Sequence, residues 1–574
     1  MNDSSNVSRR DFLKAGAAAG AVAGVGLGGF YFGYNAAIDS PVRVGVIGTG
    51  DEGSVLIGAL KPEFVEVKAI ADIRPFNQFR AFHGDWTNKD NKPSLLPVRS
   101  GLMSVYGWKT ETEARRHVKV YGPYQVLLEN AKKDGIEAII IATPLHLHAE
   151  IAIAAMNQGL HVITEKLMAQ TVGQCKEMTR KADEKRLYLA IGHQRHYNIK
   201  YWQAKDWIQR GVLGDVHSIR AQWHRGNLPF PYNDSWKVPL PPGAKQEDMA
   251  VKLDAEIVKA RKALEQSYGS ETEGWLKVLG QLEAQVADAQ LVDKDKAKNK
   301  SHFEALGYKG KTVTDANGNK VYECTPLEEL IRWRLWDHTG AGMMAELGSH
   351  QLDAASIFAS ALYPEGHPHP HPLRVVAAAN RPIFPPDREI EDHVCCIIEF
   401  PTPEYDEKDE KTHRKKISVQ YASINGNGYL GYGELVYGTK GTLALEKEEE
   451  LKLLTGSGDE GEGETAVKVT GGGGGPSLDT QSSGPARKAA GGGGGPVSRG
   501  YAEELQHWAW CIRHPSPENK PRCHPRVAMA DAIIALTTNL AVRTGQPVDF
   551  KPEWFDPAKD DTPEKDLKID QITS

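Results

Sequence analysis

The sequence predicts an α/β fold in which a doubly wound parallel sheet is followed by an α+β domain with a large open, mostly antiparallel sheet. Residues 42–192 contain short apolar, β-branched segments that alternate with segments of helical periodicity, as in strands joined by crossover helices. Residues 193–550 contain strand-like segments without regular helices between them, which favours an antiparallel sheet. A chain of 574 residues also exceeds a single hydrophobic core, so two domains are expected.

The first predicted strand, 42–47, leads into a glycine-rich loop and then a helix that reaches Leu60. The loop has the pattern Gly-x-Gly-x-x-Gly. Gly48 permits the tight turn, Gly50 lets the backbone approach a pyrophosphate, and Gly53 lets the helix pack closely on the strand. Because strand, loop and helix follow in the order that dinucleotide binding requires, this segment predicts a Rossmann domain.

The second predicted strand, 65–71, ends at Asp72, which follows Gly53 by 19 residues. An acid at this distance can bind both hydroxyls of the adenosine ribose and would repel a 2′-phosphate, so NAD is favoured over NADP. Arg74 leaves NADP open, because an arginine there can accommodate the 2′-phosphate. A helix cap or turn acid is the alternative reading of Asp72.

Glu165 and Lys166 directly follow the predicted strand 161–164. They are therefore expected at the carboxyl edge of the parallel sheet, where ligands bind in such folds. A buried ammonium at this edge can hold a substrate hydroxyl beside a nicotinamide, whereas the alternative is an ordinary surface lysine. The remaining elements of this domain are predicted as a strand at 135–142 turned by Thr143 and Pro144, helices at 146–157 and up to Lys185, and a strand at 187–192.

The segment 340–353 carries a second group of reactive side chains. Glu346 and His350 are four residues apart, so on a helix they project from the same face. An acid one turn before a histidine can orient it and raise its basicity, as a general base requires. Asp353 follows on the next turn. The alternative is a structural histidine whose hydrogen bonds are satisfied.

Five ordered segments between residue 42 and about residue 450 resemble the Gfo/Idh/MocA family of sugar-type dehydrogenases, which includes glucose-fructose oxidoreductase and inositol dehydrogenase. The resemblance implies that NAD or NADP lies between the Rossmann domain and the open sheet. It also implies that Lys166 hydrogen-bonds the reacting hydroxyl, His350 accepts its proton and Glu346 assists. The five segments are the glycine loop, Ala142-Thr143-Pro144 with His148, 159–166, 211–216 and 348–353.

These segments define the candidate site residues. The catalytic candidates are Lys166, His350 and Glu346, and no metal ligands are expected. Arg195 and Tyr197 follow the last Rossmann strand and, with Asp353, are candidates for binding a sugar; ordinary packing or ion pairing is the alternative for Arg195 and Tyr197. A further polyol-binding candidate is the group Arg332, Arg334 and Trp336. The candidate cofactor-binding residues are Gly48, Gly50, Gly53, Asp72, Arg74, Thr143, Pro144, His148 and Glu165.

Two positions depart from the family pattern. Leu167 stands where the family usually has proline, and a cis bond before a residue other than proline costs about 3–4 kcal/mol, so a trans bond is favoured there. Glu346 stands where the family usually has aspartate. The extra methylene moves the carboxylate by roughly an ångström, a displacement that can cost about 10²-fold in rate.

The amino terminus predicts export. Arg9 and Arg10 precede a Gly/Ala-rich, mildly apolar run, which together suggest that residues 1–37 form a twin-arginine signal. The partner would be the twin-arginine export machinery and the location periplasmic or otherwise exported. Cleavage of the signal and its retention as a membrane anchor both stay open, and a basic start on an ordinary helix is the remaining alternative.

Composition narrows the partners. A formal net charge of −6 without a long basic run argues against a nucleic-acid partner. The six cysteines lack metal-binding spacing, and Cys511 with Cys523 is the most plausible disulfide by proximity, with buried free thiols equally open. The second domain is also expected to form a homo-oligomer through its sheet.

The second domain has predicted strands and appendages. The charged segment 244–300 predicts a helical hairpin outside the active site. Residues 455–500, with two glycine runs, predict a flexible loop without a catalytic role, and residues 551–574 are taken as a tail. Strands are predicted at 216–223, 394–400, 416–421 and 429–446.

Three functions are consistent with the sequence. The first is an exported NAD(P)-dependent oxidoreductase that transfers a hydride between a sugar or polyol hydroxyl and nicotinamide. The second is a glycosidase that retains NAD and uses transient oxidation. The third is a non-catalytic sugar-binding homologue, motivated by the two departures and the large inserts.

Overall fold

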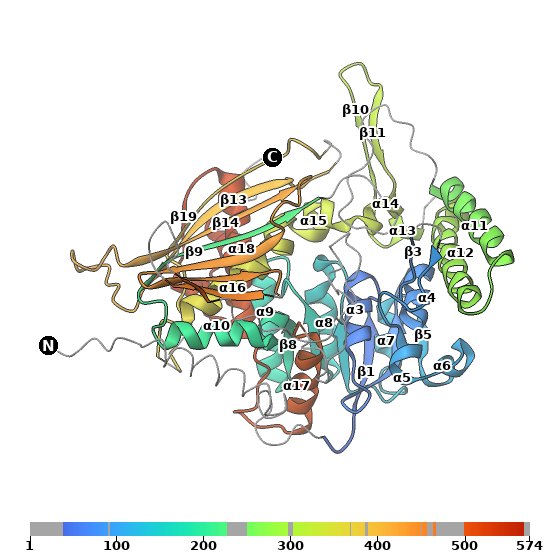
Figure 1. Ribbon diagram of the computed structural model, residues 1–574, viewed down its shortest axis with the longest axis horizontal. Helices are drawn as coiled ribbons and strands as arrows, with labels where there is room; N and C mark the ends of the chain where they lie inside the picture. Colours follow the sequence, from blue (N-terminus) through green and yellow to red (C-terminus); the bar gives the residue numbers. More distant parts are fainter. Residues whose placement is uncertain are drawn as a thin grey trace.

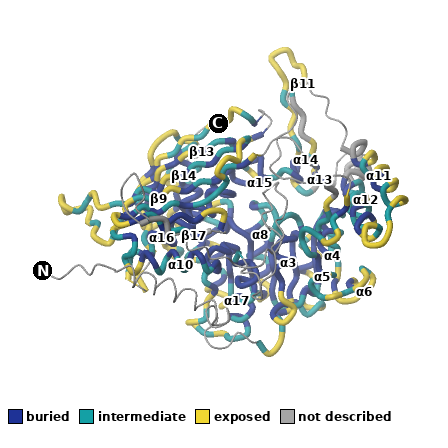
Figure 2. The backbone as a smooth tube through the Cα atoms, in the orientation of Figure 1, coloured by how far each residue is buried: buried dark blue, intermediate teal, exposed yellow. Residues whose placement is uncertain are grey.

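The computed structural model describes residues 38–567, except 90–91, 227–248, 297–301, 365, 368, 385–387, 449, 456–462 and 466–498. The predicted signal at 1–37 and nearly all of the predicted loop 455–500 therefore lie outside the described residues. Figure 1 shows the parallel-sheet domain beside a broad open sheet, with a helical hairpin at the outer side of the first domain. Buried backbone runs through both domains and across their junction (Figure 2).

The first domain contains a six-stranded parallel sheet in the order β5-β2-β1-β6-β7-β8. This is the strand order of a dinucleotide-binding Rossmann fold, so the predicted fold class is confirmed for this domain. The short edge strand β5 had no sequence signal, because three residues are too few to establish a period. The strands are β1 Val42–Ile47, β2 Val65–Ala71, β5 Lys119–Tyr121, β6 Ala138–Ile141, β7 His161–Glu165 and β8 Leu189–Gly192.

Helices cover both faces of this sheet (Figure 1). One of them, α17 (Tyr501–Arg513), comes from the part of the chain that the sequence assigns to the second domain. Trp508 of α17 is fully buried in the hydrophobic cluster that contains β1 and α3, so this return of the chain completes the first domain. The other helices of this domain are α3 Asp51–Ala59, α4 Pro75–His83, α5 Leu102–Tyr106, α6 Glu111–His117, α7 Tyr124–Asn130, α8 His148–Asn157 and α9 Val172–Lys185.

The second domain contains a mixed, mostly antiparallel sheet, as predicted. Among the described residues its order is β18-β17-β16-β15-β9-β14-β13-β12-β19, and β9 and β14 form its parallel pair. The segment predicted as one strand at 429–446 is a hairpin of two strands that turns between Gly438 and Gly441. The strands are β9 Val216–Arg225, β12 Arg374–Asn380, β13 His393–Pro401, β14 Lys416–Asn425, β15 Tyr432–Gly438, β16 Gly441–Glu446, β17 Glu450–Thr455, β18 Gly463–Thr465 and β19 Val548–Asp549.

Helices pack on one face of this sheet and leave the other partly open. α16 (Ser349–Ser360) and α18 (Pro525–Thr544) lie against the strands. By length and composition α18 could cross a membrane, but 67% of its apolar stretch is buried inside the protein, as in the core helix of a globular domain. On the opposite face, Val376 and Ile397 are paired in register and about half exposed. Oligomerisation through this face stays a prediction. Further helices are α10 Ile199–Gln209, α14 Pro326–Ile331, α15 Asp337–Gly340, α19 Pro552–Phe555 and α20 Pro563–Asp566.

The predicted helical hairpin is present as α11 (Met249–Glu265) and α12 (Ser270–Lys296). It packs on α4 of the Rossmann domain, and the main chain then passes through α13 (His302–Ala305) and the ribbon β10 (Lys311–Thr314) and β11 (Lys320–Cys324). The insert was expected to be remote from the active site. That expectation is wrong for Asp288 of α12, which ion-pairs with a residue that lines the main pocket.

Five cysteines are free thiols: Cys175, Cys395, Cys396, Cys511 and Cys523. Cys511 and Cys523 are both buried and unpaired with each other, so the proposed disulfide is wrong. The sulfur of Cys511 lies 3.8 Å from Nε2 of His507 instead. Proximity in sequence was a poor guide because the two cysteines belong to different elements, α17 and the segment before α18.

Candidate active site

A pocket of about 1060 Å³ lies between the carboxyl edge of the parallel sheet and the chain that follows the helical insert. The pocket brings together nine of the residues predicted from sequence: Gly48, Gly50, Asp72, Arg74, Thr143, Pro144, Glu165, Lys166 and Glu346.

The glycine loop forms one wall of the pocket through its backbone. Gly48 has φ +84°, and a Cβ there would lie 2.5 Å from the carbonyl oxygen of Ala142. At Gly53 a Cβ would lie 2.1 Å from the carbonyl oxygen of Gly48. Both positions therefore exclude a side chain, and the resulting close turn opens onto the amino terminus of α3, where a pyrophosphate can bind.

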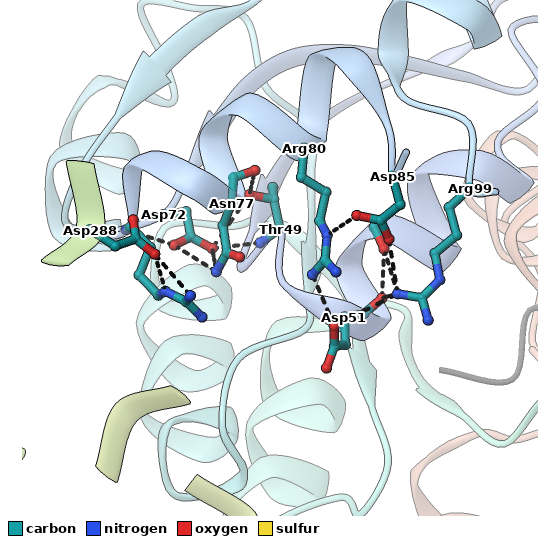
Figure 3. Close-up of polar contacts among 10 residues, drawn as sticks. Thr49, Asp51, Asp72, Asn77, Arg80, Asp85, Arg99 and Asp288 are labelled. Carbon is teal, nitrogen blue, oxygen red and sulfur yellow. Dashed lines mark hydrogen bonds and ion pairs between the residues drawn. The ribbon is translucent and has the colours of Figure 1, made fainter. Parts of the chain in front are cut away.

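The carboxylate of Asp72 is directed at the glycine loop (Figure 3). It accepts hydrogen bonds from the backbone N–H of Thr49 at 2.8 Å, from the N–H of Arg74 at 2.9 Å and from Nδ2 of Asn77 at 3.1 and 3.2 Å. These contacts tie the end of β2 to the loop after β1. Asp72 is 8% exposed and lines the pocket, in the position of a residue that binds a ribose diol.

Two arginines neutralise the acid at the start of α3. Asp51 lies in the first turn, where its charge would repel a pyrophosphate. Its carboxylate pairs with Arg80 at 2.9 Å and with Arg99 at 3.7 Å, and Asp85 shares both arginines (Figure 3). Despite burial, Arg80 and Arg99 hold the pKa of Asp51 below its ordinary value. With Arg80 itself lining the pocket, this loop fits an anionic dinucleotide.

A buried charge cluster lies at the other end of the pocket. Nζ of Lys166 donates to the backbone carbonyl of Glu346 at 2.9 Å and approaches Oε2 of Glu346 at 3.4 Å. Nε of Arg334 donates to the same Oε2 at 2.9 Å. Despite burial, Lys166 and Arg334 lower the pKa of Glu346. One carboxylate therefore anchors both cations and fixes the lysine at the pocket wall.

The family comparisons agree with this geometry. Residues 42–193 match the model of GFO_IDH_MocA, the oxidoreductase family with an NAD-binding Rossmann fold, and residues 6–26 match the TAT (twin-arginine translocation) pathway signal sequence. The chain carries an NAD-binding Rossmann domain of the Gfo/Idh/MocA oxidoreductase family at residues 42–193. It also carries a TAT signal sequence, which indicates export across a membrane.

Known relatives are similar to this chain over limited stretches. scyllo-Inositol 2-dehydrogenase (NADP(+)) of Bacillus subtilis is 33% identical over 99 residues, 17% of this chain and 28% of its own length. A glycosyl hydrolase family 109 protein of Solibacter usitatus is 24% identical over 216 residues, 36% of this chain and 44% of its own length. These alignments span less than half of either relative.

A solved structure shares the fold over nearly the whole chain. An inositol dehydrogenase homologue of Azotobacter vinelandii, in complex with NADH and myo-inositol, aligns with a TM-score of 0.52 over 90% of this chain and 100% of its own. Sequence identity is 14%, so this likeness concerns the fold.

At Leu167 and Glu346, the two positions that depart from the Gfo/Idh/MocA pattern, the structure differs from the sequence expectation. The bond between Lys166 and Leu167 is cis, so the expected trans bond is wrong. Leu167 is fully buried, and its carbonyl lies 2.9 Å from Nδ1 of His148, whose Nε2 lies 2.9 Å from the carbonyl of Thr143. His148 is 1% exposed and does not line the pocket; it joins the turns after β6 and β7. Its expected contact with the cofactor is replaced by this bridging position.

Glu346 does not orient His350, contrary to the sequence expectation. It lies in a π-helical turn, Met344–Gly348, and its carboxylate turns to Lys166 and Arg334. The regular helical spacing assumed from sequence does not hold through such a turn. Burial lowers the pKa of His350 well below its ordinary value, and Lys166 and Arg195 lower it further, so the expected rise in basicity is also wrong.

His350 lies behind the pocket rather than in its wall. It is 6% exposed, its ring is 5.1 Å from that of Trp223, and its Nδ1 has no hydrogen-bond partner among the described residues. Lys166 acts electrostatically on it, so the two predicted catalytic side chains occupy one region.

Glu165 is buried beside Lys166 in the pocket wall. Its Oε2 accepts a hydrogen bond from the backbone N–H of Lys166 at 3.2 Å, and its Oε1 has no partner among the described residues. Burial, followed by the charge of Glu52, raises the pKa of Glu165 well above its ordinary value. Both effects favour the protonated carboxyl, which keeps negative charge low in the pocket wall beside Lys166.

The three predicted substrate-binding residues lie outside this pocket. Arg195 is 1% exposed and bound to Glu434 at 3.0 Å, Glu448 at 2.8 Å and the carbonyl of His350. For Arg195, these ion pairs match the alternative that the sequence left open. The other two are equally enclosed: the Tyr197 hydroxyl contacts His507 and the N–H of Arg522, and Asp353 pairs with His196 at 2.7 Å.

Sequence reasoning missed the residues that close the pocket from the second domain. Tyr308, Leu330, Ile331 and Trp333 line it, all from the segment that follows the helical insert. This segment has no motif and no sustained period, so only its tertiary position marks it. Of the polyol-binding candidates, Arg334 lines the pocket, whereas Trp336 is buried with the guanidinium of Arg388 4.5 Å from its ring centroid.

His338 forms pH-dependent ion pairs that hold the segment closing the pocket. His338 lies 2.9 Å from Glu329 and 2.8 Å from Glu389, and these hydrogen bonds raise its pKa from 6.5 to about 10. Because the folded pKa is raised, the stabilisation is complete below pH 6.5 and is lost as the pH rises through about 10. We expect His338→Gln to lower the thermal midpoint at pH 6 and to have no effect above pH 10. An equal difference at both pH values would contradict this assignment.

Proposed function

We propose that this protein is an exported NAD(P)-dependent oxidoreductase that transfers a hydride between a CH–OH group of a sugar or polyol and nicotinamide. The observation that carries the proposal is the single pocket that joins a dinucleotide-binding glycine loop to Lys166 and Glu346. NAD is favoured over NADP because Asp72 lies where a 2′-phosphate would otherwise be placed. We place the folded enzyme in the periplasm or another exported location.

When bound, NAD supplies the hydride acceptor, and the side chains do the positioning. The ammonium of Lys166 has three hydrogen-bond donors, and its bonds to the carbonyl and the carboxylate of Glu346 use two of them. The third donor is directed to the substrate hydroxyl. Because Glu346 also binds Arg334, the lysine is held without needing the substrate, and a positioned reactant of this kind can contribute roughly 7–11 kcal/mol through effective concentration.

In this proposal His350 accepts the hydroxyl proton from a substrate that reaches past the pocket wall to the imidazole behind it. Its lowered pKa keeps the imidazole neutral at physiological pH, which is the form that takes up a proton, and its Nδ1 is without a partner among the described residues. Glu346 assists through Lys166 rather than through His350. Asp353, Arg195 and Tyr197 support the wall around His350 through their ion pairs and hydrogen bonds.

A NAD-dependent glycosidase is the second candidate. It is favoured by the similarity to two proteins named as glycosyl hydrolase family 109 members, over 36% and 38% of this chain. Retained NAD would suit an exported enzyme, because free nicotinamide cofactor is scarce outside the cytoplasm. In this case the first hydride transfer is reversed within the catalytic cycle, so no net NADH accumulates.

One pair of measurements tests these proposals. Native mass spectrometry of the exported protein is expected to show a retained NAD mass. The protein is then given a panel of sugars and polyols, and separately nitrophenyl glycosides, while NADH absorbance is followed. NADH formation supports the oxidoreductase, and aglycone release without net NADH supports the glycosidase. Carbohydrate binding with neither reaction, unchanged by Lys166→Ala and His350→Ala, would establish a non-catalytic homologue instead.

A further inference from the structure

The helical insert reaches into the nucleotide end of the pocket through one side chain. Asp288 of α12 is fully buried, and its Oδ2 accepts from Nε of Arg74 at 2.9 Å and from Nη2 of Arg74 at 2.8 Å (Figure 3). Its Oδ1 accepts from the backbone N–H of Phe76 at 2.9 Å, in the first turn of α4. Asp288 thus binds a side chain and a helix start in a domain from which it is separated by more than 200 residues.

The partner of Asp288 is Arg74, the residue that leaves NADP open in the sequence. Arg74 lines the pocket two residues after Asp72, and an arginine at this place accommodates the 2′-phosphate in NADP-binding Rossmann domains. Here two of its donors, Nε and Nη2, converge on one oxygen of a buried carboxylate. Hydrogen bonds between charged groups are stronger than those between neutral ones. A 2′-phosphate would have to compete with a buried carboxylate that is already in place.

The hairpin is held firmly enough to keep Asp288 in position. Gln281 of α12 forms two hydrogen bonds of 2.9 Å with the backbone of Trp86, one with its N–H and one with its carbonyl. Trp275 and Val278 are buried in a cluster that packs against the same tryptophan. Gly280 lies against the ring of Phe79, with a Cβ there only 3.2 Å from the ring. The position of α12 against α4 is therefore fixed by several independent contacts.

We propose that Asp288 is a specificity-determining residue that sets the cofactor preference to NAD by holding Arg74 away from a 2′-phosphate. The inference rests on the proposed use of a nicotinamide dinucleotide. Asp288 pairs with the guanidinium of Arg74, and Asp72 accepts a hydrogen bond from the backbone N–H of the same residue. This end of the pocket therefore holds two carboxylates for one guanidinium, so its formal charge is negative. The uncharged 2′-hydroxyl of NAD tolerates this arrangement, whereas a phosphate is repelled.

The test measures binding, not turnover. Full-length protein freed of nucleotide is titrated with NAD⁺ and with NADP⁺ by calorimetry, for wild type, Asp288→Asn, and Asp288→Asn combined with Arg74→Met. We expect Asp288→Asn to shift the ratio of the two dissociation constants by about tenfold toward NADP⁺, because the charged hydrogen bonds that hold Arg74 are weakened. The added Arg74→Met is expected to abolish that gain.

Matched variants distinguish selectivity from structure. Glu283→Gln removes an exposed acid of the same helix and is expected to leave the ratio unchanged. Arg74→Met alone covers the case in which Asp288→Asn does not fold, and it is expected to change NADP⁺ affinity by less than about threefold, because wild-type Arg74 is already engaged. A large loss of NADP⁺ affinity in Arg74→Met, or an Asp288→Asn variant with an unchanged ratio, would overturn the role of Asp288. Failure of wild type to bind either nucleotide would instead overturn the proposed function.

Discussion

Replacing Lys166 with methionine is expected to lower kcat by about 10²–10⁴-fold, the range typical of a group that assists proton transfer. Methionine keeps the length of the side chain but removes the donor to the substrate hydroxyl. Glu346 keeps its bond to Arg334, so the pocket wall is expected to persist. Steady-state rates of NADH formation, with NAD⁺ affinity measured in parallel, check the prediction.

The control for this experiment is Lys68→Met. Lys68 lies on β2, pairs with Glu66 at 3.1 Å and has a side chain that is 28% exposed, so its loss is expected to leave kcat unchanged. Unchanged turnover in Lys166→Met, with a folded protein, would remove Lys166 from the mechanism. A loss confined to NAD⁺ affinity would instead assign Lys166 to cofactor binding.

Replacing Glu346 with glutamine is expected to destabilise the fold by about 3–5 kcal/mol, the cost of leaving a buried ion pair without one of its partners. Lys166, Arg334 and Glu346 are at most 8% exposed, so water cannot replace the lost charge. Urea unfolding followed by tryptophan fluorescence and by circular dichroism measures the change. Activity is expected to fall as well, because Lys166 loses its anchor.

The loss of stability in Glu346→Gln is expected to depend on pH. The pKa of Glu346 is lowered by Lys166 and Arg334, so its contribution to stability is complete above about pH 4.5 and is lost as the pH falls through the folded value. The stability difference between wild type and Glu346→Gln is therefore expected to shrink in acid. Glu184→Gln, at an exposed i,i+3 pair with Lys181, is expected to leave the unfolding midpoint unchanged. A difference that stays constant down to pH 2 would contradict the charge assignment.

Most of the Rossmann framework could be predicted from sequence because its signals are local. The glycine loop, the buried β-branched strands and Asp72 at the end of β2 are each defined within a few residues. Eight of the nine predicted residues that line the pocket follow from one topological fact, that parallel strands bring their carboxyl ends to the same edge. The ninth, Glu346, comes from a helical turn of the second domain. In the second domain β9, β13 and β14 match predicted strands, whereas β12, β17, β18 and β19 were not predicted. The turn at 438–441 was also missed, since alternation continues through a tight hairpin.

The candidate site could be predicted only in part. Glu346 and His350 were paired by helical spacing, and a π-helical turn redirects the carboxylate to Lys166. Arg195 was selected by its position after a strand, but two glutamates from the second sheet engage its guanidinium. The partners of Glu346 and Arg195 depend on which buried charged groups the fold brings into contact, and no local sequence pattern encodes those contacts.

The sequence by itself determined the class of fold, the dinucleotide loop and the lysine at the strand end, because periodicity, glycine spacing and strand order are properties of neighbouring residues. Only the tertiary structure decided which distant residues contact each other. Lys166 meets Glu346 across 180 positions, Arg74 meets Asp288 across 214, and α17 returns to complete the first domain. Buried charges must be paired wherever the fold brings them together, so the chemistry of this site is set by contacts between segments that the sequence presents as unrelated.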